Sequence, residues 1–342
     1  MKRNNPVIEV NELSDSTKKS MKTRIISGIV AGVIAVPCII LGDWFYFLLS
    51  VFVVVVGVIE IIKCSKPKHS IWLSVISIVL VLLLTLWPIL RSFMVDDYFG
   101  SGYYKLWPAF ESVYLSVTIL AASLFLIFFF VVMDKELTVG DATFIFTALL
   151  LLAIGIQSGM FLRYVSIADR YHWVSGMALP SVPYFNWEEN FKTCTLFIYV
   201  LIATFSTDIF AYFFGVFFGK HKMNPRISPK KTWEGFVGGV ISSCVISSAF
   251  ALIFAACGKP IFSILDLEHW YYIVALSLAI PMFAVLGDFV FSSFKRYYNI
   301  KDFGNIMPGH GGVLDRLDSL IFALTGAAII LCLMCGRGGV FL

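Results

Sequence analysis

Charged residues are scarce in this sequence. Asp, Glu, Lys and Arg make up 14% of the 342 residues and hydrophobic residues make up 59%. Soluble domains carry about 25% charged residues. So few charges could not cover the apolar surface of a soluble protein of this length. The composition excludes a soluble globular protein and predicts a polytopic membrane protein.

Other absences narrow the class further. No small-residue cleavage site follows the first apolar run, residues 25–42, so we expect a retained helix and not a signal peptide. The sequence has neither an internal repeat nor the paired broken helices that transporters favour. Cys332 and Cys335 match CxxC, but no second cysteine or histidine pair lies near them, which favours packing over metal binding.

Long apolar runs dominate the rest of the chain. A helix needs about 20 apolar residues to cross a bilayer core of about 30 Å. Runs of about that length lie near residues 25–42, 44–63, 71–91, 113–133, 139–163, 193–217, 235–257, 269–293 and 317–336. The turn at Gly42-Asp43 makes the first two a helical hairpin. The predicted fold is all-α, with about nine transmembrane helices.

We expect one membrane domain in three parts. A polar cytoplasmic tail covers residues 1–24, an amino-terminal region of about five helices covers 25–190, and a catalytic region of about four helices covers 191–342. With the amino terminus in the cytoplasm, cytoplasmic segments carry 19 of the 26 lysines and arginines and the other side carries 7. This bias predicts that orientation. The exported loops 92–112 and 164–192 are rich in aromatic residues, which suits the headgroup zone.

Acidic residues inside membrane helices are costly and mark functional sites. Asp208 lies in the sixth run, and Tyr212 follows four residues later on the same helical face. Gly215 and Gly219 repeat at a spacing of four, which permits close helix approach. Asp208 is therefore either a functional carboxylate or a hydrogen-bonded residue in a small-residue seam.

A basic loop, residues 220–231, follows that helix. Ser228 before Pro229 predicts a helix N-cap with proline at the first helical position. Lys230 and Lys231 would then lie in the first turn, where cations are unfavourable unless an anion lies between them and the helix end. The pattern predicts an anion site. The alternative is ordinary positive-inside charge in contact with anionic lipid.

The eighth run contains Asp288 near its cytoplasmic end, with Lys295 seven residues later and Arg296 beside it. A spacing of seven is two helical turns, so Asp288 and Lys295 lie on nearly the same face. Asp288 could therefore be a metal ligand or one half of a structural ion pair.

The ninth run begins with the sequence "PGHGGVLDRLDS". Its glycines, Gly309, Gly311 and Gly312, allow backbone N–H groups to approach an anion closely. Asp315 and Asp318 lie three residues apart and repel each other unless a cation is present. Hard divalent cations bind carboxylates together with phosphate oxygens. The four aspartates beside several cations thus predict a membrane-embedded, cytoplasm-facing enzyme that acts on phosphates, with a lipid as one substrate.

At these residues the chain resembles the CDP-diacylglycerol synthase (phosphatidate cytidylyltransferase) family. The matching positions in the carboxyl-terminal signature are Ser292, Lys295, Arg296, Lys301, Asp302, Pro308, Gly309, His310, Gly311, Gly312, Asp315, Arg316 and Asp318. Upstream matches are Ser206, Asp208, Ala211 and Tyr212, and the segment SPKKTWEG from Ser228 to Gly235. Many family members have glutamate where this chain has Phe291, so position 291 receives no role.

The resemblance implies that CTP and phosphatidate react to give CDP-diacylglycerol and pyrophosphate with Mg²⁺, at a site for one metal ion or two. It implies a homodimer. The compact chain, without a long regulatory extension, favours a bacterial plasma membrane over an organelle, and we expect no nucleic-acid partner. Asp288, Asp315 and Asp318, with Asp208, would hold metal. Lys295, Arg296 and Arg316 would neutralise phosphates, and Lys230 and Lys231 would guide a substrate. The turn Gly309–Gly312 with His310 would cradle a phosphate, and Tyr212, Ser228 and Ser292 would lie at the substrate.

Two other classes remain open from the sequence. One is an ion-coupled transporter, because intramembrane aspartates can serve ion coupling. The other is a different membrane phosphotransferase, such as a CTP-dependent polyprenol kinase or a phospho-sugar transferase.

Overall fold

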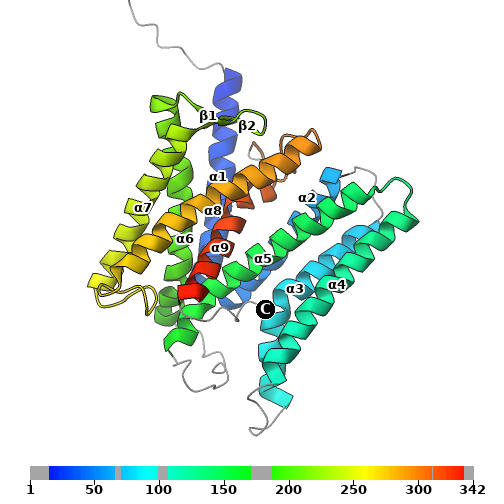
Figure 1. Cartoon of the computed structure of the whole chain (residues 1–342), viewed down its shortest axis with the longest axis horizontal. Helices are drawn as coiled ribbons and strands as arrows, with labels where there is room; N and C mark the ends of the chain where they lie inside the picture. The colour runs from blue at the N-terminus through cyan, green and yellow to red at the C-terminus, as the bar shows by residue number, and fades with distance from the viewer. Residues whose placement is uncertain (1–14, 66–70, 99–106, 171–186, 310, 335–342) are drawn as a thin grey trace, which may run out of the picture.

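The computed structural model describes residues 15–65, 71–98, 107–170, 187–309 and 311–334 (Figure 1). These residues form nine helices and one short hairpin. The helices are α1 (Asp15–Leu41), α2 (Asp43–Ser65), α3 (Ile71–Tyr98), α4 (Trp107–Met133), α5 (Val139–Arg170), α6 (Trp187–Phe218), α7 (Trp233–Ala256), α8 (Trp270–Tyr297) and α9 (Leu314–Met334). The strands are β1 (Lys222–Asn224) and β2 (Ser228–Thr232).

A helix lies at each of the nine predicted runs. Among the described residues, six helices are long and apolar enough to cross a membrane: α2, α5, α6, α7, α8 and α9. The apolar stretches of α1, α3 and α4 within the same described part are shorter: Ile26–Leu41, Ile71–Thr85 and Val117–Met133. Helices suit this environment because each satisfies its own backbone hydrogen bonds. The chain is therefore an integral membrane protein.

Several helices extend beyond the predicted apolar runs. α1 begins at Asp15, so residues 15–24 of the predicted tail are helical, whereas 1–14 lie outside the described residues. Helical structure also occupies both ends of the predicted loops 92–112 and 164–192. Hydropathy indicates where a helix meets lipid, but local i to i−4 hydrogen bonds decide where it ends.

The predicted hairpin of α1 and α2 is confirmed. Gly42 has a φ of 70°, and its N–H donates to the carbonyl of Cys38 at 3.1 Å. This left-handed conformation favours glycine. Arg163 of α5 is fully buried beside the turn and donates to the carbonyls of Ile39 (2.8 Å) and Ile40 (3.1 Å). An arginine thus satisfies the last carbonyls of α1.

The carboxyl-terminal helices pack closely: α6 against α7, and α8 against both α7 and α9. In Figure 1, α8 runs obliquely across the molecule. Small residues bring α6 and α7 together. A Cβ atom at Gly235 would lie 2.7 Å from the carbonyl oxygen of Ala211, and one at Gly239 would lie 2.9 Å from that of Thr207. Gly215 faces Gly235 across this seam, in agreement with the close helix approach predicted from the spacing of Gly215 and Gly219.

The loop after α6 corrects one prediction. Ser228 does not cap a helix; it begins β2, which pairs antiparallel with β1. The N-cap of α7 is Thr232, whose Oγ1 accepts the N–H of Gly235 at 3.2 Å. Ser228-Pro229 is a good helix start locally, but Thr232 offers a second one, and pairing of the strands selects it. Lys230 and Lys231 consequently lie in a strand, with side chains on opposite faces.

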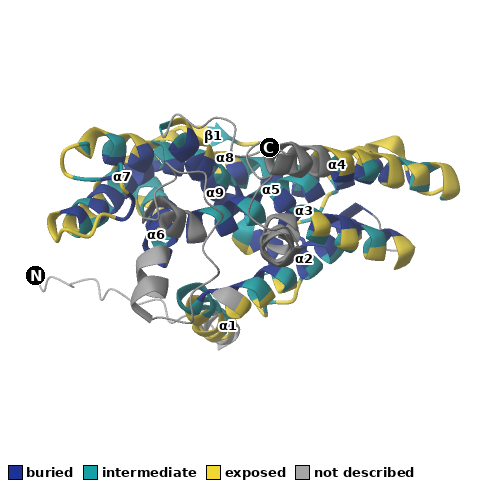
Figure 2. Ribbon diagram, turned by 90° about the horizontal axis from the view of Figure 1, so that it is seen from below, coloured by how far each residue is buried: buried dark blue, intermediate teal, exposed yellow. Residues whose placement is uncertain are grey.

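Buried apolar side chains form two clusters. One contains residues of α2, α5, α6, α7, α8 and α9, and the other joins α2–α5 to the facing sides of α8 and α9. Figure 2 shows these buried faces turned toward the middle of the molecule, with many exposed residues along the outer helices. Exposed apolar side chains are expected where a helix faces lipid.

Contacts between distant segments place several predicted cytoplasmic segments at one end of the bundle. Ser27 of α1 donates its hydroxyl to the carbonyl of Pro308 at 2.9 Å. The Tyr298 hydroxyl, just after α8, donates to Oδ1 of Asp141 at the start of α5 at 3.0 Å. Burial, followed by this hydrogen bond, raises the pKa of Tyr298 above its usual value. The candidate site lies at this end.

Candidate active site

The structure gathers the four predicted aspartates. Asp208 comes from α6, Asp288 from α8, and Asp315 and Asp318 from α9. Asp288 interacts electrostatically with both Asp208 and Asp318, and Asp318 with Asp315. We call these four residues the carboxylate cluster. Carboxylates that interact in this way repel one another, so the cluster needs cations beside it.

Lys295 neutralises one side of the cluster. Its Nζ lies 2.9 Å from Oδ1 of Asp315 and 3.5 Å from Oδ2 of Asp318, and its side chain is only 10% exposed. The backbone holds Asp315 as well, because the N–H groups of Phe303 (2.8 Å) and Gly312 (2.9 Å) donate to its Oδ2. Lys295, Asp315 and Asp318 are referred to below as the inner ion-pair group.

Lys231 neutralises the other side. Its Nζ forms an ion pair with Oδ2 of Asp288, while the Ser292 hydroxyl donates to Oδ1 of Asp288 at 3.0 Å. The side chains of Lys231 and Asp288 are 26% and 25% exposed. We call them the outer ion pair. The simple Asp288–Lys295 pair that the spacing along α8 permitted is not formed, because each residue meets a partner from another element.

Asp208 differs from the other three aspartates. It is exposed on α6 and makes no hydrogen bond or ion pair with any residue in the described ranges. Lys231 and Arg316 attract it and Asp288 repels it. Tyr212, one turn further along, is 68% exposed. Asp208 is therefore not a hydrogen-bonded residue of the helix seam, and its carboxylate has only electrostatic neighbours among the described residues.

The remaining cations divide into two kinds. Arg316 is exposed on the first turn of α9 and attracts Asp208. Lys230 is exposed on β2, on the strand face opposite Lys231. Arg296 donates instead to two backbone carbonyls, those of Ile227 (3.3 Å) and Ile300 (3.1 Å). Arg296 thus joins the end of α8 to the hairpin through backbone carbonyl oxygens.

The glycine-rich turn is held by its own backbone. Met307 and Gly311 exchange N–H···O bonds of 3.0 and 3.2 Å. Gly309 and Gly311 have φ values of 76° and 89°, which favour glycine. The Gly312 N–H already donates to Asp315. His310 lies outside the described residues. The phosphate-cradle role of this turn stays a prediction.

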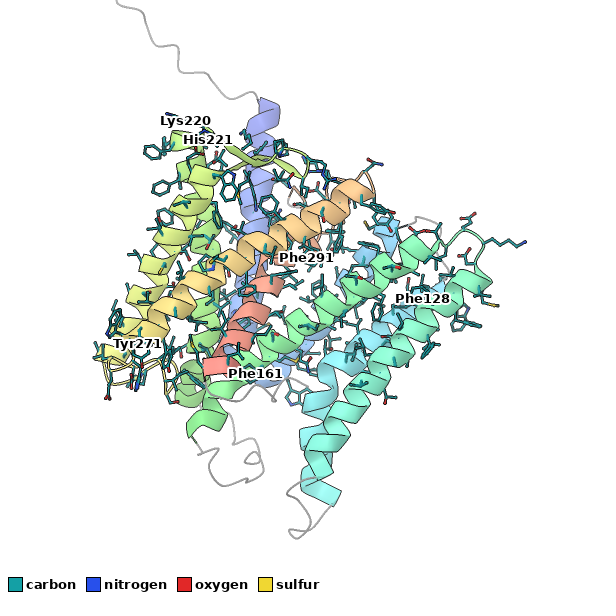
Figure 3. The ribbon with its side chains drawn as sticks, in the orientation of Figure 1. Phe128, Phe161, Lys220, His221, Tyr271 and Phe291 are labelled. Carbon is teal, nitrogen blue, oxygen red and sulfur yellow. The ribbon has the colours of Figure 1, made fainter. Side chains whose placement is uncertain are left out.

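Phe291, at the position where many family members have glutamate, is surrounded by apolar side chains. Phe291 of α8 (Figure 3) is fully buried. Its ring centroid lies 5.9, 6.1 and 6.3 Å from those of Phe294, Phe303 and Phe322. The three contacts are edge-to-face, a favoured geometry for aromatic pairs. A carboxylate at this position would be surrounded by rings, so the structure explains why phenylalanine is accommodated here.

Sequence reasoning missed two acidic residues that hold the site together. Glu60 of α2 accepts the N–H groups of Val313 (2.9 Å) and Leu314 (2.8 Å). Glu234 of α7 accepts the N–H groups of Lys220 and His221, and its Oε1 lies 2.6 Å from Nδ1 of His221. The available signal for Glu60 was that it is the only acidic residue in its apolar run.

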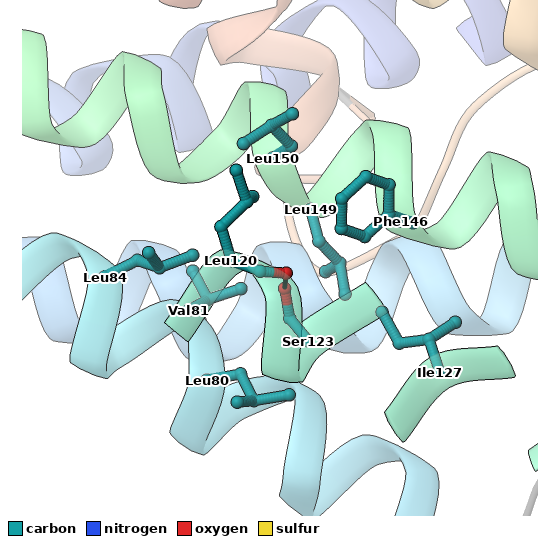
Figure 4. Close-up of a pocket in the computed structure, with 9 residues that line it drawn as sticks. All are labelled: Leu80, Val81, Leu84, Leu120, Ser123, Ile127, Phe146, Leu149 and Leu150. Carbon is teal, nitrogen blue, oxygen red and sulfur yellow. Dashed lines mark hydrogen bonds between the residues drawn. The ribbon is translucent and has the colours of Figure 1, made fainter. Parts of the chain in front are cut away.

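Two other features lie apart from this site. Asp266, Glu268 and His269 converge before α8, where Oδ1 of Asp266 accepts the His269 N–H at 2.7 Å. That hydrogen bond lowers the pKa of Asp266. A small cavity between α3, α4 and α5 is apolar except for Ser123, which bonds to the carbonyl of Leu120 (Figure 4). Neither contributes to the carboxylate cluster.

The fold and the cluster define a class: an integral membrane protein with carboxylates and lysines suited to phosphate chemistry at one end of its helices. A sequence profile of the cytidylyltransferase family matches residues 22–334. This chain therefore belongs to the cytidylyltransferase family.

Similar proteins carry one name. The chain is 30% identical over 316 residues to the phosphatidate cytidylyltransferase of Bacillus subtilis (strain 168), covering 92% of this chain and 98% of that protein. It is 28% identical over 311 residues to the protein of that name from Staphylococcus saprophyticus, covering 91% and 99%. Against the one from Staphylococcus aureus (strain COL), identity is 38% over 147 residues, covering 43% and 53%.

Proposed function

We propose that this protein transfers the cytidylyl group of CTP to phosphatidate, forming CDP-diacylglycerol and releasing pyrophosphate. The observation that carries the proposal is the carboxylate cluster with its two lysines at one end of a membrane-helix bundle. Family membership and near full-length relatives named phosphatidate cytidylyltransferase support it. The product would enter phospholipid biosynthesis.

The chemistry requires charge neutralisation more than proton transfer. A phosphate oxygen of phosphatidate attacks the α-phosphorus of CTP, and the bond to the pyrophosphate oxygen breaks. A phosphomonoester has a second pKa near 6, so its oxygen is already ionised at neutral pH. The opposing factor is repulsion between two anions. Positioned cations should therefore provide most of the rate enhancement.

The donor chemistry suits Mg²⁺, which binds one or two carboxylates together with phosphate oxygens, although no three carboxylates of the cluster converge on one point in this structure. Asp208 has no hydrogen bond within the described residues, and the oxygens of Asp288 and Asp318 face exchangeable partners: a lysine, a hydroxyl or an adjacent N–H. Asp315 fits less well as a ligand, because both its oxygens are already engaged. One or two of Asp208, Asp288 and Asp318 would hold the ion together with phosphate oxygens of the substrate, and Asp315 would orient Lys295. Bound Mg²⁺ would neutralise phosphate charge.

The cations then have separate tasks. Lys231, which comes from the hairpin and pairs with Asp288, would bind an incoming phosphate. Arg316, which attracts Asp208, would face the same substrate. Lys295 would hold Asp315 and Asp318 in place as the pyrophosphate leaves. Tyr212 and Ser292, beside Asp208 and Asp288, remain candidate substrate-binding residues.

The proposal also includes the predicted number of membrane-crossing helices, their orientation and the oligomeric state. All nine helices would cross the bilayer, with the carboxylate cluster in a polar funnel on the cytoplasmic side of a bacterial plasma membrane. The bias of 19 lysines and arginines against 7 supports this orientation. The homodimer implied by the resemblance is part of the same proposal.

Label transfer tests the reaction directly. Detergent-purified protein receives phosphatidate, Mg²⁺ and CTP labelled at the α-phosphate, and label is followed into lipid together with released pyrophosphate. We expect equal amounts of labelled lipid and pyrophosphate, and no transfer with EDTA. A polyprenol kinase would instead move label from γ-labelled CTP. Transfer of γ-label and not α-label would overturn the proposal.

Asp208→Asn is the informative site variant in that assay. Asp208 has no hydrogen-bond partner among the described residues, so the change should leave folding intact. We expect turnover to fall about 10²-fold or more, the range seen when one preorganised electrostatic contact is removed. Tyr212→Phe, on the same exposed face, is the matched control and should lose less. Wild-type turnover in Asp208→Asn would exclude Asp208 from the site.

A further inference from the structure

Glu60 is a buried acid in an otherwise apolar helix. Its side chain is 2% exposed, and it is the only acidic residue in the membrane-spanning stretch Trp44–Ser65. A buried carboxylate is strongly unfavourable unless hydrogen bonds compensate its lost hydration. Here compensation comes from a segment more than 250 residues later, through the N–H groups of Val313 and Leu314.

These two N–H groups belong to the start of α9. A helix leaves its first four N–H groups without partners inside the helix, and acceptors there stabilise its beginning. Two carboxylates divide this task. Glu60 accepts the N–H of Leu314, the first residue of α9, and that of Val313 just before it, while Asp315 accepts the N–H of Gly312 in the segment leading to the helix. The start of α9 is therefore fixed by one acid from its own first turn and one from α2.

The backbone leaves room for Glu60 on two sides. A Cβ atom at Gly304 or at Gly312 would lie 2.5 Å from its Oε1, closer than such contacts occur. Glycine at both positions lets the segment before α9 close around the carboxylate. Val313 and Leu314 are themselves buried, so water cannot easily replace Glu60 as their partner.

We propose that Glu60 is a positioning residue: by capping α9 from α2, it sets where Asp315 and Asp318 stand relative to Lys295. Asp315 comes directly after Leu314, so any shift of the Leu314 backbone moves the inner ion-pair group. This inference rests on the proposed function for its catalytic readout. Through Glu60, helix α2 would help to position a site whose proposed substrate contacts lie in α6–α9 and the hairpin.

Glu60→Gln tests the inference with little change in size. The glutamine oxygen can accept one of the two N–H groups, but its NH₂ group then faces the other as a second donor. Ser65→Ala is the matched control. Ser65 is also buried on α2, but its hydroxyl bonds only to the Ile62 carbonyl of the same helix. Glu60→Asp, which keeps two acceptor oxygens on a shorter side chain, serves as the conservative variant.

Two measurements are made on detergent-purified full-length protein. Hydrogen exchange of peptides covering residues 303–318 should be at least tenfold faster in Glu60→Gln, with α7 unchanged and Ser65→Ala like wild type. In the label-transfer assay, kcat should fall at least tenfold, while KM for CTP changes less than threefold. Glu60→Asp should recover part of kcat, and thermal denaturation should show that each sample is folded.

Each arm can overturn the inference separately from the proposed function. Unchanged exchange at residues 303–318 in Glu60→Gln would show that Glu60 does not fix α9, whatever the substrate is. A loss of kcat matched by the unfolded fraction, with no recovery in Glu60→Asp, would reduce Glu60 to a structural role and overturn the inference. Failure of the wild-type protein to label lipid would count against the proposed function instead.

Discussion

The two lysines that meet the carboxylate cluster lie in contrasting surroundings. In the inner ion-pair group, Lys295 is 10% exposed and joins two rigid membrane helices. In the outer ion pair, Lys231 is 26% exposed and comes from a two-stranded hairpin. Backbone N–H groups fix Asp315 from a second side, whereas Asp288 meets, within the described part of the chain, only the Ser292 hydroxyl besides Lys231.

The contrast indicates a division of work. Removing one member of a buried ion pair costs about 3–5 kcal/mol, whereas exposed pairs contribute about 0–1 kcal/mol. The outer ion pair, at intermediate exposure, is the cheaper one to open when an anionic substrate arrives. The inner ion-pair group is therefore suited to a framework role, stabilising the folded structure, and the outer ion pair is suited to binding substrate. Three substitutions test this division.

Lys295→Met should have the largest effect. It leaves Asp315 and Asp318 facing each other without their cation, and breaking such a buried pair costs about 3–5 kcal/mol. We expect a clear fall in the midpoint of thermal denaturation in detergent, together with loss of label transfer. Adding Asp318→Asn removes the repelling carboxylate, so the double variant should regain part of the midpoint. A wild-type midpoint in Lys295→Met would contradict the framework role.

Asp288→Asn should separate catalysis from stability. The asparagine keeps the shape and can still accept the Ser292 hydroxyl, so the denaturation midpoint should stay near wild type. Turnover should fall about 10²-fold, as when one preorganised electrostatic contact is removed. Ser293→Ala is the control on the same helix, since the Ser293 hydroxyl bonds only to the Val290 carbonyl. If Asp288→Asn lowered the midpoint as much as Lys295→Met, the distinction between the two pairs would fail.

The sequence predicted the helices and the gathering of the four aspartates, because hydropathy and the spacing of acidic residues are local properties. It did not predict the pairing of lysines with carboxylates. Asp288 and Lys295 share a helical face, yet the hairpin brings Lys231 to Asp288 and α9 brings two aspartates to Lys295. The hairpin was missed for the same reason: the local sequence Ser228-Pro229 favours a helix start, and the pairing of β1 with β2 is not a local property.

Glu60 was beyond sequence reasoning for a related reason. Its position in an apolar run showed that it needed partners, but nothing nearby in the chain provides them. Its partners are the backbone N–H groups of Val313 and Leu314, and any residue other than proline would offer the same N–H. Only the packing of α2 beside the start of α9 reveals the contact.

Lys231→Gln compared with Lys230→Gln should give the smallest and sharpest difference. Both variants remove one charge from adjacent positions of β2, but only Lys231 meets the carboxylate cluster. A hydrogen bond to a charged group contributes about 1.5–3 kcal/mol, so Lys231→Gln should lower kcat/KM for CTP or phosphatidate about tenfold or more. Lys230→Gln acts only through exposed charge, whose effect salt screens beyond about 8–10 Å. Its deficit should be roughly twofold at most and should disappear as ionic strength rises, whereas that of Lys231→Gln should persist. Equal deficits that vanish together in salt would show that the hairpin acts through its net charge, and that the outer ion pair is no more than part of a basic surface.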